Sequence, residues 1–295
     1  MLVPFLLLAF TVPLTSAAQA DRSGCDSEGY LSRSSVAEEQ GDYAVALALL
    51  DSAMLHAKAD KDDDMVARAL VRKGVMRQQL GDLDAGLSAF YQALGLRERL
   101  HDPIGLAEVD NNIGSIHQYQ RNFNKAREYY GRSLGIYEQL GQRRDVAKAW
   151  NNYGTLYEDE GRPDSALVFH RRSLGIWEEL GDEVWTALSF LHIGTCHEKL
   201  GQGDSARTYL QRSVSLLEQT NSPYLLSAAR HTLGDHQRQA GDLQDALRWC
   251  GSALHGAEVL HAVPLEQKAC ECLYKTYEEL GDEHQALVYY RRFVQ

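Results

Sequence analysis

Apolar residues recur at helical spacing along most of the chain. Between residues 104 and 119, the apolar positions include Ile104, Ala107, Ile113 and Ile116. Separations of three residues, or multiples of three, place them on one stripe of an α-helix. Residues 123–140 repeat the pattern, and the polar pair Arg121-Asn122 lies between the two stretches. The pattern predicts two antiparallel helices joined by a short turn.

This helix pair returns every forty residues without an insertion. The turn position is almost always glycine, as expected for a left-handed helix end, and reads Gly41, Gly81, Arg121, Gly161, Gly201, Gly241 and Gly281. A second position, where the two helices must approach closely, reads Gly74, Gly114, Gly154, Gly194 and Gly234. A third is mainly large and apolar and reads Phe90, Tyr130, His170, Leu210, Cys250 and Tyr290.

Such a period predicts an all-α fold, a solenoid of about seven stacked antiparallel helix hairpins. The expected hairpins span residues 27–60, 61–100, 101–141, 142–181, 182–221, 222–261 and 262–295. A solenoid grows by adding interfaces, so we expect residues 21–295 to form one elongated domain.

The spacing of small and large residues resembles the tetratricopeptide repeat. Counted from Gly114, that family places Ala twelve residues on, an aromatic residue at sixteen and a small residue at nineteen, which are Ala126, Tyr130 and Ser133 here. The resemblance covers about residues 27–295. The unit is longer than the common one of thirty-four residues, and is similar to that of kinesin light chains, spindle-orientation adaptors and exported bacterial repeat proteins. It implies a right-handed α-solenoid whose first helices line a concave groove.

The resemblance also implies which side chains face that groove. The matching positions are Asn111, Asn112, Ser115, Gln118, Asn151, Asn152, Thr155, Glu158, His192, Thr195, Glu198, His231, Asp235 and Arg238. Paired asparagines are unusual inside a helix, because their amides compete for backbone hydrogen bonds. They could hold the backbone of an extended peptide, or one of each pair could bond across to the neighbouring helix. We therefore expect a non-catalytic scaffold that binds a peptide or a partner protein.

Charge narrows the class of partner. The formal net charge of −11 argues against nucleic acid, whose phosphates require a basic surface. Glu158, Asp159 and Glu198 would form an acidic rim that favours a basic or neutral peptide. The groove offers few cations beyond Arg68 and Lys148, so capture of an acidic C-terminal tail is not expected.

The first twenty residues lie outside the repeats. Residues 2–14 form a short apolar run, and Ala18-Gln19-Ala20 provides a small-x-small cleavage pattern before Asp21. We expect a signal peptide over residues 1–20 and a periplasmic or secreted protein. No Lys or Arg precedes the run, and a buried helix is the alternative. No later segment is expected to span a membrane.

The chain has five cysteines. If it is exported, they can form disulfides, but an odd number cannot pair completely within one chain. Antiparallel helices could bring Cys250 close to Cys270 or Cys272, which geometry must decide. We expect instead that Cys250 fills the large apolar column as a free buried thiol, and that Cys196 fills the column of Met76, Ile116 and Leu156.

No residue is assigned a catalytic role, and no metal or cofactor is expected. Ser133 lies in a Gly-Arg-Ser-Leu-Gly string, but in the middle of a helix and not at the strained turn that exposes a nucleophile. The remote enzymatic alternative is a zinc site made of two i, i+4 pairs, His192 with Cys196 and His231 with Asp235.

The last repeat leaves two more alternatives. It stops within its second helix, which fits the sensor region of a truncated signalling protein. We also expect self-association at this end, because the last repeat carries the apolar residues Leu287, Tyr290 and Phe293.

Overall fold

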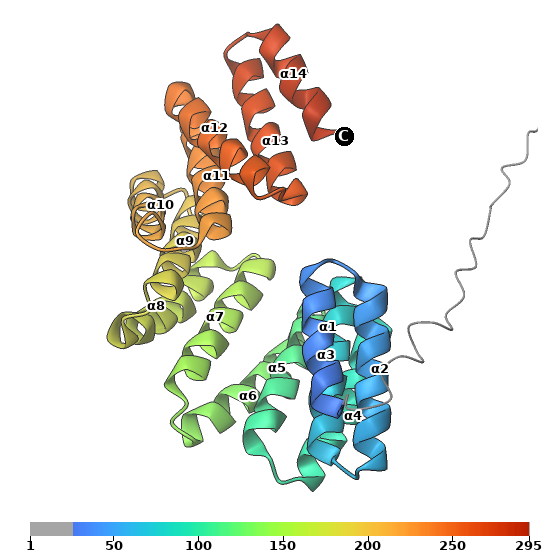
Figure 1. The fold of residues 1–295 in the computed structure, drawn as a ribbon. Helices are drawn as coiled ribbons and strands as arrows, with labels where there is room; N and C mark the ends of the chain where they lie inside the picture. The colour runs from blue at the N-terminus through green and yellow to red at the C-terminus, as the bar shows by residue number, and fades with distance from the viewer. Residues whose placement is uncertain (1–25, 295) are drawn as a thin grey trace, which may run out of the picture. The chain divides into compact units, whose positions relative to one another are not determined.

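The computed structural model describes residues 26–294, apart from the side chain of Glu39. These residues form helices and no strand, which confirms the all-α prediction (Figure 1). The predicted signal peptide and Cys25 lie outside the described residues. Within residues 26–294, no helix combines the length and apolar character needed to cross a membrane. The helices are α1 (Ser27–Glu39), α2 (Tyr43–Ala59), α3 (Asp63–Gln79), α4 (Leu83–Arg99), α5 (Pro103–Tyr119), α6 (Phe123–Gln139), α7 (Arg143–Asp159), α8 (Pro163–Leu180), α9 (Glu183–Lys199), α10 (Gly203–Leu217), α11 (Pro223–Gln239), α12 (Leu243–Val259), α13 (Val263–Glu279) and α14 (Glu283–Phe293).

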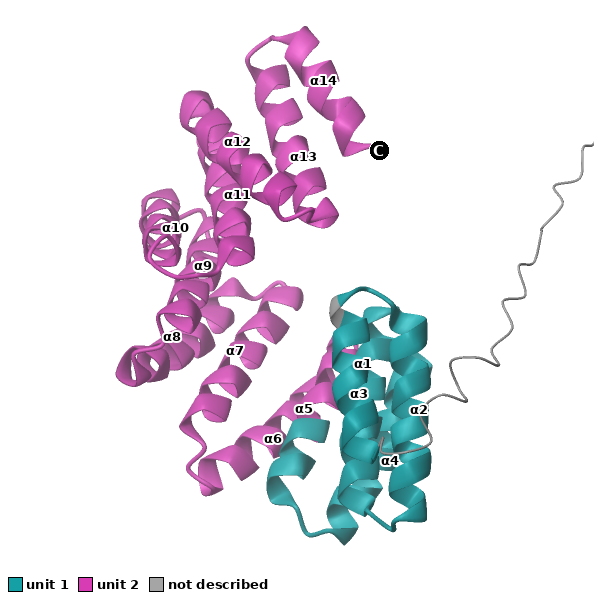
Figure 2. Ribbon diagram, viewed as in Figure 1, with its two compact units in different colours: residues 1–109 teal, residues 110–295 magenta. Residues whose placement is uncertain are grey.

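The chain divides into two compact units, residues 1–109 and 110–295 (Figure 2). In the first unit, α1 packs against α2 and α3 against α4. In the second, α7 pairs with α8, α9 with α10, α11 with α12 and α13 with α14. The division of residues 21–295 into seven repeat units remains a prediction from the sequence.

The same tight turn separates nearly all of these helices. Gly41 and Gly81 adopt φ values of +76° and +78°, the left-handed region that glycine tolerates best. Lys61 at +60° and His101 at +52° adopt the same conformation midway between the glycines of the turn column. The backbone therefore repeats every twenty residues, although the forty-residue sequence period reveals only every second turn.

Aspartates start several helices by accepting a backbone hydrogen bond. Oδ1 of Asp62 accepts from the N–H of Met65 at 2.9 Å, and Oδ1 of Asp182 accepts from that of Trp185 at 3.2 Å. These bonds satisfy N–H groups that have no partner inside the helix. Asn122, at the same position before α6, makes no such side-chain bond.

The glycine column provides sockets for the large side chains of the third column. A Cβ atom on Gly114 would lie 2.7 Å from Cδ1 of Tyr130, and one on Gly194 would lie 2.7 Å from Cδ2 of Leu210. The sequence predicted a close approach of the two helices of a pair at this glycine. In the structure, the large side chain of the second helix packs directly on the glycine of the first.

We expect Gly114→Ala to destabilise the protein by about 1–3 kcal/mol, because the Tyr130 ring must move out of its socket. The matched control is Gly135→Ala on α6, where an added Cβ meets nothing within 4 Å. There the loss of glycine flexibility should stabilise the protein by roughly 0.5–1 kcal/mol. Urea denaturation of both variants checks the prediction, and equal effects would contradict the socket interpretation.

Candidate partner-binding surface

The fourteen sequence-predicted site residues form a regular half-buried row. In eight-residue stretches of α5, α7, α9 and α11 that start at residues 111, 151, 191 and 231, the first, second, fifth and eighth positions are half-buried. The other positions are buried, except Tyr153 and Tyr157 on α7, and the half-buried positions include all the predicted side chains. We call these fourteen residues the first-helix row.

Side chains of the row connect neighbouring first helices. Nδ2 of Asn152 on α7 donates to Oδ1 of Asn111 on α5 at 2.7 Å. Nε2 of Gln118 donates to Oδ2 of Asp159 at 2.6 Å. Oδ1 of Asn151 lies 3.2 Å from Nδ1 of the buried His170 on α8. Asn111, Asn151 and Asn152 therefore take part in inter-helix contacts, which the sequence left as one of two alternatives.

Glu158 is the centre of the densest polar cluster in the row. Its Oε1 accepts from Nε2 of His170 at 3.0 Å and from Nδ1 of His192 at 3.3 Å, and its Oε2 accepts from Nζ of Lys199 at 2.9 Å. The two imidazole rings stack with centroids 4.7 Å apart. Burial alone would raise the pKa of Glu158, but these hydrogen bonds outweigh burial and hold its pKa well below the usual range.

Acidic and basic groups farther along the row are likewise engaged. Oε1 of Glu198 accepts from Nδ1 of His236 at 2.9 Å. Arg238 bonds to Asp235 on its own helix at 2.8 Å and to Glu279 on α13 at 2.6 Å. The rim carboxylates thus have partners inside the protein, and the preference for a basic or neutral partner stays a prediction.

The two cations considered for an acidic tail are paired as well. Both terminal nitrogens of Arg68 bond to the carboxylate of Glu28, at 2.9 and 3.0 Å. Nζ of Lys148 bonds to Oδ1 of Asp145 at 3.0 Å. Ser133, the serine of the nucleophile-like string, is completely buried in the middle of α6, as the packing interpretation predicted.

The four-residue zinc alternative is wrong as a set. Among the described residues, the one group of three or more potential metal ligands that converges is Glu158, His170 and Cys196. His192 faces Glu158 of the preceding helix pair, and His231 and Asp235 belong to no such group. Only Cys196 is common to the predicted and observed sets.

The prediction of a free Cys250 is also wrong. Cys250 on α12 and Cys272 on α13 form a disulfide, with Cα atoms 6.2 Å apart. Among the described cysteines, Cys196 and Cys270 are free and buried. Cys196 lies in the buried column of Met76, Ile116 and Leu156, as predicted.

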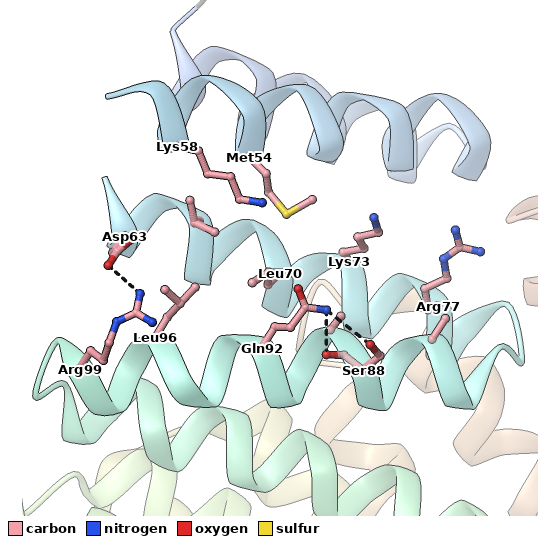
Figure 3. A pocket seen from close by; sticks show the side chains of 13 residues that line it. Met54, Lys58, Asp63, Leu70, Lys73, Arg77, Ser88, Gln92, Leu96 and Arg99 are labelled. Carbon is pink, nitrogen blue, oxygen red and sulfur yellow. Dashed lines mark hydrogen bonds and ion pairs between the residues drawn. The ribbon is translucent and has the colours of Figure 1, made fainter. Parts of the chain in front are cut away.

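A hollow in the first unit was not predicted from the sequence. It has a volume of about 700 Å³ and lies among α2, α3 and α4 (Figure 3). Val66, Leu70 and Leu96 give it apolar walls, whereas Lys73 and Arg99 are paired with Asp51 and Asp63 at 2.6 and 2.9 Å. Lysines and arginines on helix surfaces are common, so their gathering here gave no sequence signal.

Comparison with known proteins identifies the repeat. A family description named "Tetratricopeptide repeat" matches residues 65–139, 105–179 and 185–256, which together exceed half of the chain. No curated protein sequence matches the chain significantly.

Solved structures share the fold at low sequence identity. BtubC (BKLC) from P. vanneervenii is 19% identical over 81% of this chain and 94% of its own, with a TM-score of 0.61. A Rap protein complexed with competence and sporulation factor is 16% identical, covers 91% of this chain and 74% of its own, and has a TM-score of 0.71. NprR in complex with its cognate peptide NprX is 13% identical, covers 90% and 76%, and has a TM-score of 0.64. These structures show a shared fold, and the family match over more than half of the chain shows that the chain belongs to the tetratricopeptide repeat family.

Proposed function

We propose that this protein is a non-catalytic scaffold that binds a peptide segment or a partner protein along the first-helix row. The observation that carries the proposal is the repeated pattern of exposure on α5, α7, α9 and α11, which presents polar side chains at equivalent positions of four successive helix pairs. A row of amides, hydroxyls and imidazoles offers both donors and acceptors to an extended backbone.

Two kinds of observation support a peptide as the ligand. The inter-helix bonds of Asn152 and Gln118 fix the side chains of the row before any partner arrives, which lowers the entropy cost of binding. Two proteins of similar fold, the Rap protein and NprR, were solved with a factor and a peptide, respectively. Fold likeness at this identity supports the proposal without naming the partner.

The proposal is tested by a bulky substitution at Thr195, in the middle of the row. Its hydroxyl donates to the carbonyl of His192 on the same helix, so Thr195→Arg breaks no bond between helices. An arginine there should obstruct the row and reduce partner capture at least tenfold, a loss of about 1.4 kcal/mol of binding free energy. The measurement is affinity capture from the exported fraction, followed by titration of the purified partner.

The matched control is Thr208→Arg on α10. Thr208 is exposed on a second helix and donates to the carbonyl of Asp204, so the variant adds the same charge and loses the same kind of bond. Capture that survives Thr208→Arg but fails with Thr195→Arg supports the proposal. Equal capture by both variants would move the interface away from the row.

We also propose that the protein acts outside the cytoplasm. The apolar run and cleavage pattern before Asp21 support export, and so does the Cys250–Cys272 disulfide, because disulfides persist mainly in oxidising compartments. N-terminal sequencing of the protein recovered from cell fractions would test this, since a chain that starts at Met1 in the cytoplasm contradicts export.

Two finer features of the partner belong to the same proposal. The net charge of −11 favours a neutral or basic peptide over an acidic one. The helix α14 has no buried residue, and Leu287 and Tyr290 remain about half exposed at 49% and 47%, which supports self-association through this helix. Sedimentation over a range of concentrations would test the second feature, and a monomer throughout would exclude it.

A further inference from the structure

Three chemically different metal ligands converge at the joint between α7, α8 and α9. A carboxylate oxygen of Glu158, a ring nitrogen of His170 and the sulfur of Cys196 all lie within 4.8 Å of one another. His170 and Cys196 are completely buried, and the side chain of Glu158 is 10% exposed. The partner-binding proposal assigns no chemistry to this cluster.

The surroundings of His170 orient it as a ligand. Its Nδ1 faces Oδ1 of Asn151 at 3.2 Å, and that oxygen accepts an Nδ1–H in the metal-bound state. In the metal-free chain Nε2 donates to Oε1 of Glu158 at 3.0 Å; when an ion binds between them, the ring proton moves to Nδ1 and the Nε2 lone pair faces the ion. Metal-bound histidines typically donate their other N–H to a carbonyl or carboxylate in this way.

Two further groups flank the three ligands. Nδ1 of His192 lies 3.3 Å from the same Oε1 of Glu158, but its ring stacks on that of His170 and it lies outside the converging set. Lys199 holds the other carboxylate oxygen, Oε2, at 2.9 Å, which leaves Oε1 facing the histidines. A carboxylate, an imidazole and a thiol are a ligand set typical of zinc, whereas calcium and magnesium prefer oxygen ligands alone.

We propose that Glu158, His170 and Cys196 form a zinc site that links α7, α8 and α9. The zinc ion takes the place between the carboxylate and the imidazole of His170, and Cys196 binds it as the thiolate. Burial raises the pKa of the free Cys196 thiol to about 12, so binding must release that proton to solvent. Three protein ligands and one water complete a four-coordinate shell, and the bound ion stabilises the joint because it links three helices.

The test uses cobalt as a spectroscopic probe for zinc. The chain is prepared without a polyhistidine tag, freed of metal with a chelator that is then removed, and titrated with Co²⁺. The intact protein should give the visible bands of a four-coordinate ion and a near-ultraviolet thiolate-to-cobalt band, and stoichiometric Zn²⁺ should abolish both. Absence of the thiolate band in the intact chain overturns the proposal.

Paired variants assign the ligands. Cys196→Ala should lose the thiolate band, and Cys270→Ala, which removes the other free buried cysteine, should keep it. His170→Leu should bind Co²⁺ at least tenfold more weakly, and it should fold because Leu210 fills the equivalent socket over Gly194, whereas His255→Gln on α12 should bind unchanged. Asn151→Ala should weaken binding by roughly 10- to 100-fold, as the loss of an orienting partner does. A thiolate band that survives Cys196→Ala overturns the proposal, and so does unchanged affinity in folded His170→Leu.

Discussion

Removal of the Cys250–Cys272 disulfide is expected to lower the free energy of unfolding by about 3 kcal/mol, the value for a loop of this size. The bridge joins α12 to α13 across 22 residues, and both cysteines are buried among Leu254, Ala269 and Leu273. The cross-link restricts the unfolded chain. The reduced protein therefore gains more conformational entropy on unfolding than the oxidised protein does. Urea denaturation with and without reductant measures the difference.

The effect should be concentrated near the bridge. A repeat protein gains its stability from each helix pair and its nearest neighbours, so amide hydrogen exchange should accelerate in α12, α13 and α14 and remain unchanged in α7 and α8. The double variant Cys250→Ala/Cys272→Ala should be insensitive to reductant, whereas Cys270→Ala should respond as the intact chain does. An intact chain with the same urea midpoint in both conditions would show that the bridge contributes no stability.

The disulfide marks one limit of what the sequence could predict. The antiparallel turn between α12 and α13 brings Cys250 near two cysteines, but residues two apart on a helix point in directions about 200° apart. Only one of Cys270 and Cys272 can face Cys250, and the rotation of α13 decides which. The large apolar column explained Cys250 equally well without a bridge, so the sequence alone favoured the wrong alternative.

The helices themselves were largely predictable. The apolar stripe between residues 104 and 119 and the pattern of residues 123–140 correspond to α5 (Pro103–Tyr119) and α6 (Phe123–Gln139). Agreement is close because the same hydrophobic pattern recurs in register in every repeat. A helix end that is ambiguous in one repeat can therefore be placed from the equivalent ends in the other repeats. The hairpin boundaries at residues 61 and 101 were predicted, but the left-handed conformation of Lys61 and His101 was not, because no glycine marks these turns.

The sequence predicted which residues lie on the first-helix row, but not which residues their side chains contact. Glu158 and His192 were assigned to the groove from their register, whereas His170 was assigned to the large apolar column. The structure joins all three, since His170 lies on Gly154 as a core residue and still reaches Glu158 with its Nε2. A core position that also carries a polar contact cannot be recognised from hydrophobic periodicity, which separates positions by burial alone.

Replacement of Glu158 by alanine is expected to destabilise the metal-free protein by about 3 kcal/mol, the lower range for removing one partner of a buried charged contact. His170 would lose its acceptor inside the core, and Lys199 and His192 would lose theirs at the surface of the row. Glu158→Gln should cost less, because its amide oxygen still accepts one bond. Urea denaturation in excess chelator measures both variants without any contribution from bound metal.

Glu178→Ala on α8 is the matched control, because Glu178 is exposed and its loss should change stability by no more than about 0.5 kcal/mol. A loss for Glu158→Ala no larger than this would contradict the prediction.

A double-mutant cycle separates the cost of the orphaned imidazole from that of the lost carboxylate. Leucine occupies the position equivalent to His170 in the next helix pair, where Leu210 fills the socket over Gly194, so His170→Leu should be accommodated. In that background Glu158→Ala should cost less than half as much, since no buried ring nitrogen is left without a partner. An unchanged cost would mean that Glu158 stabilises the fold through Lys199 and His192, and the joint would then be a surface ion pair instead of a buried link between helix pairs.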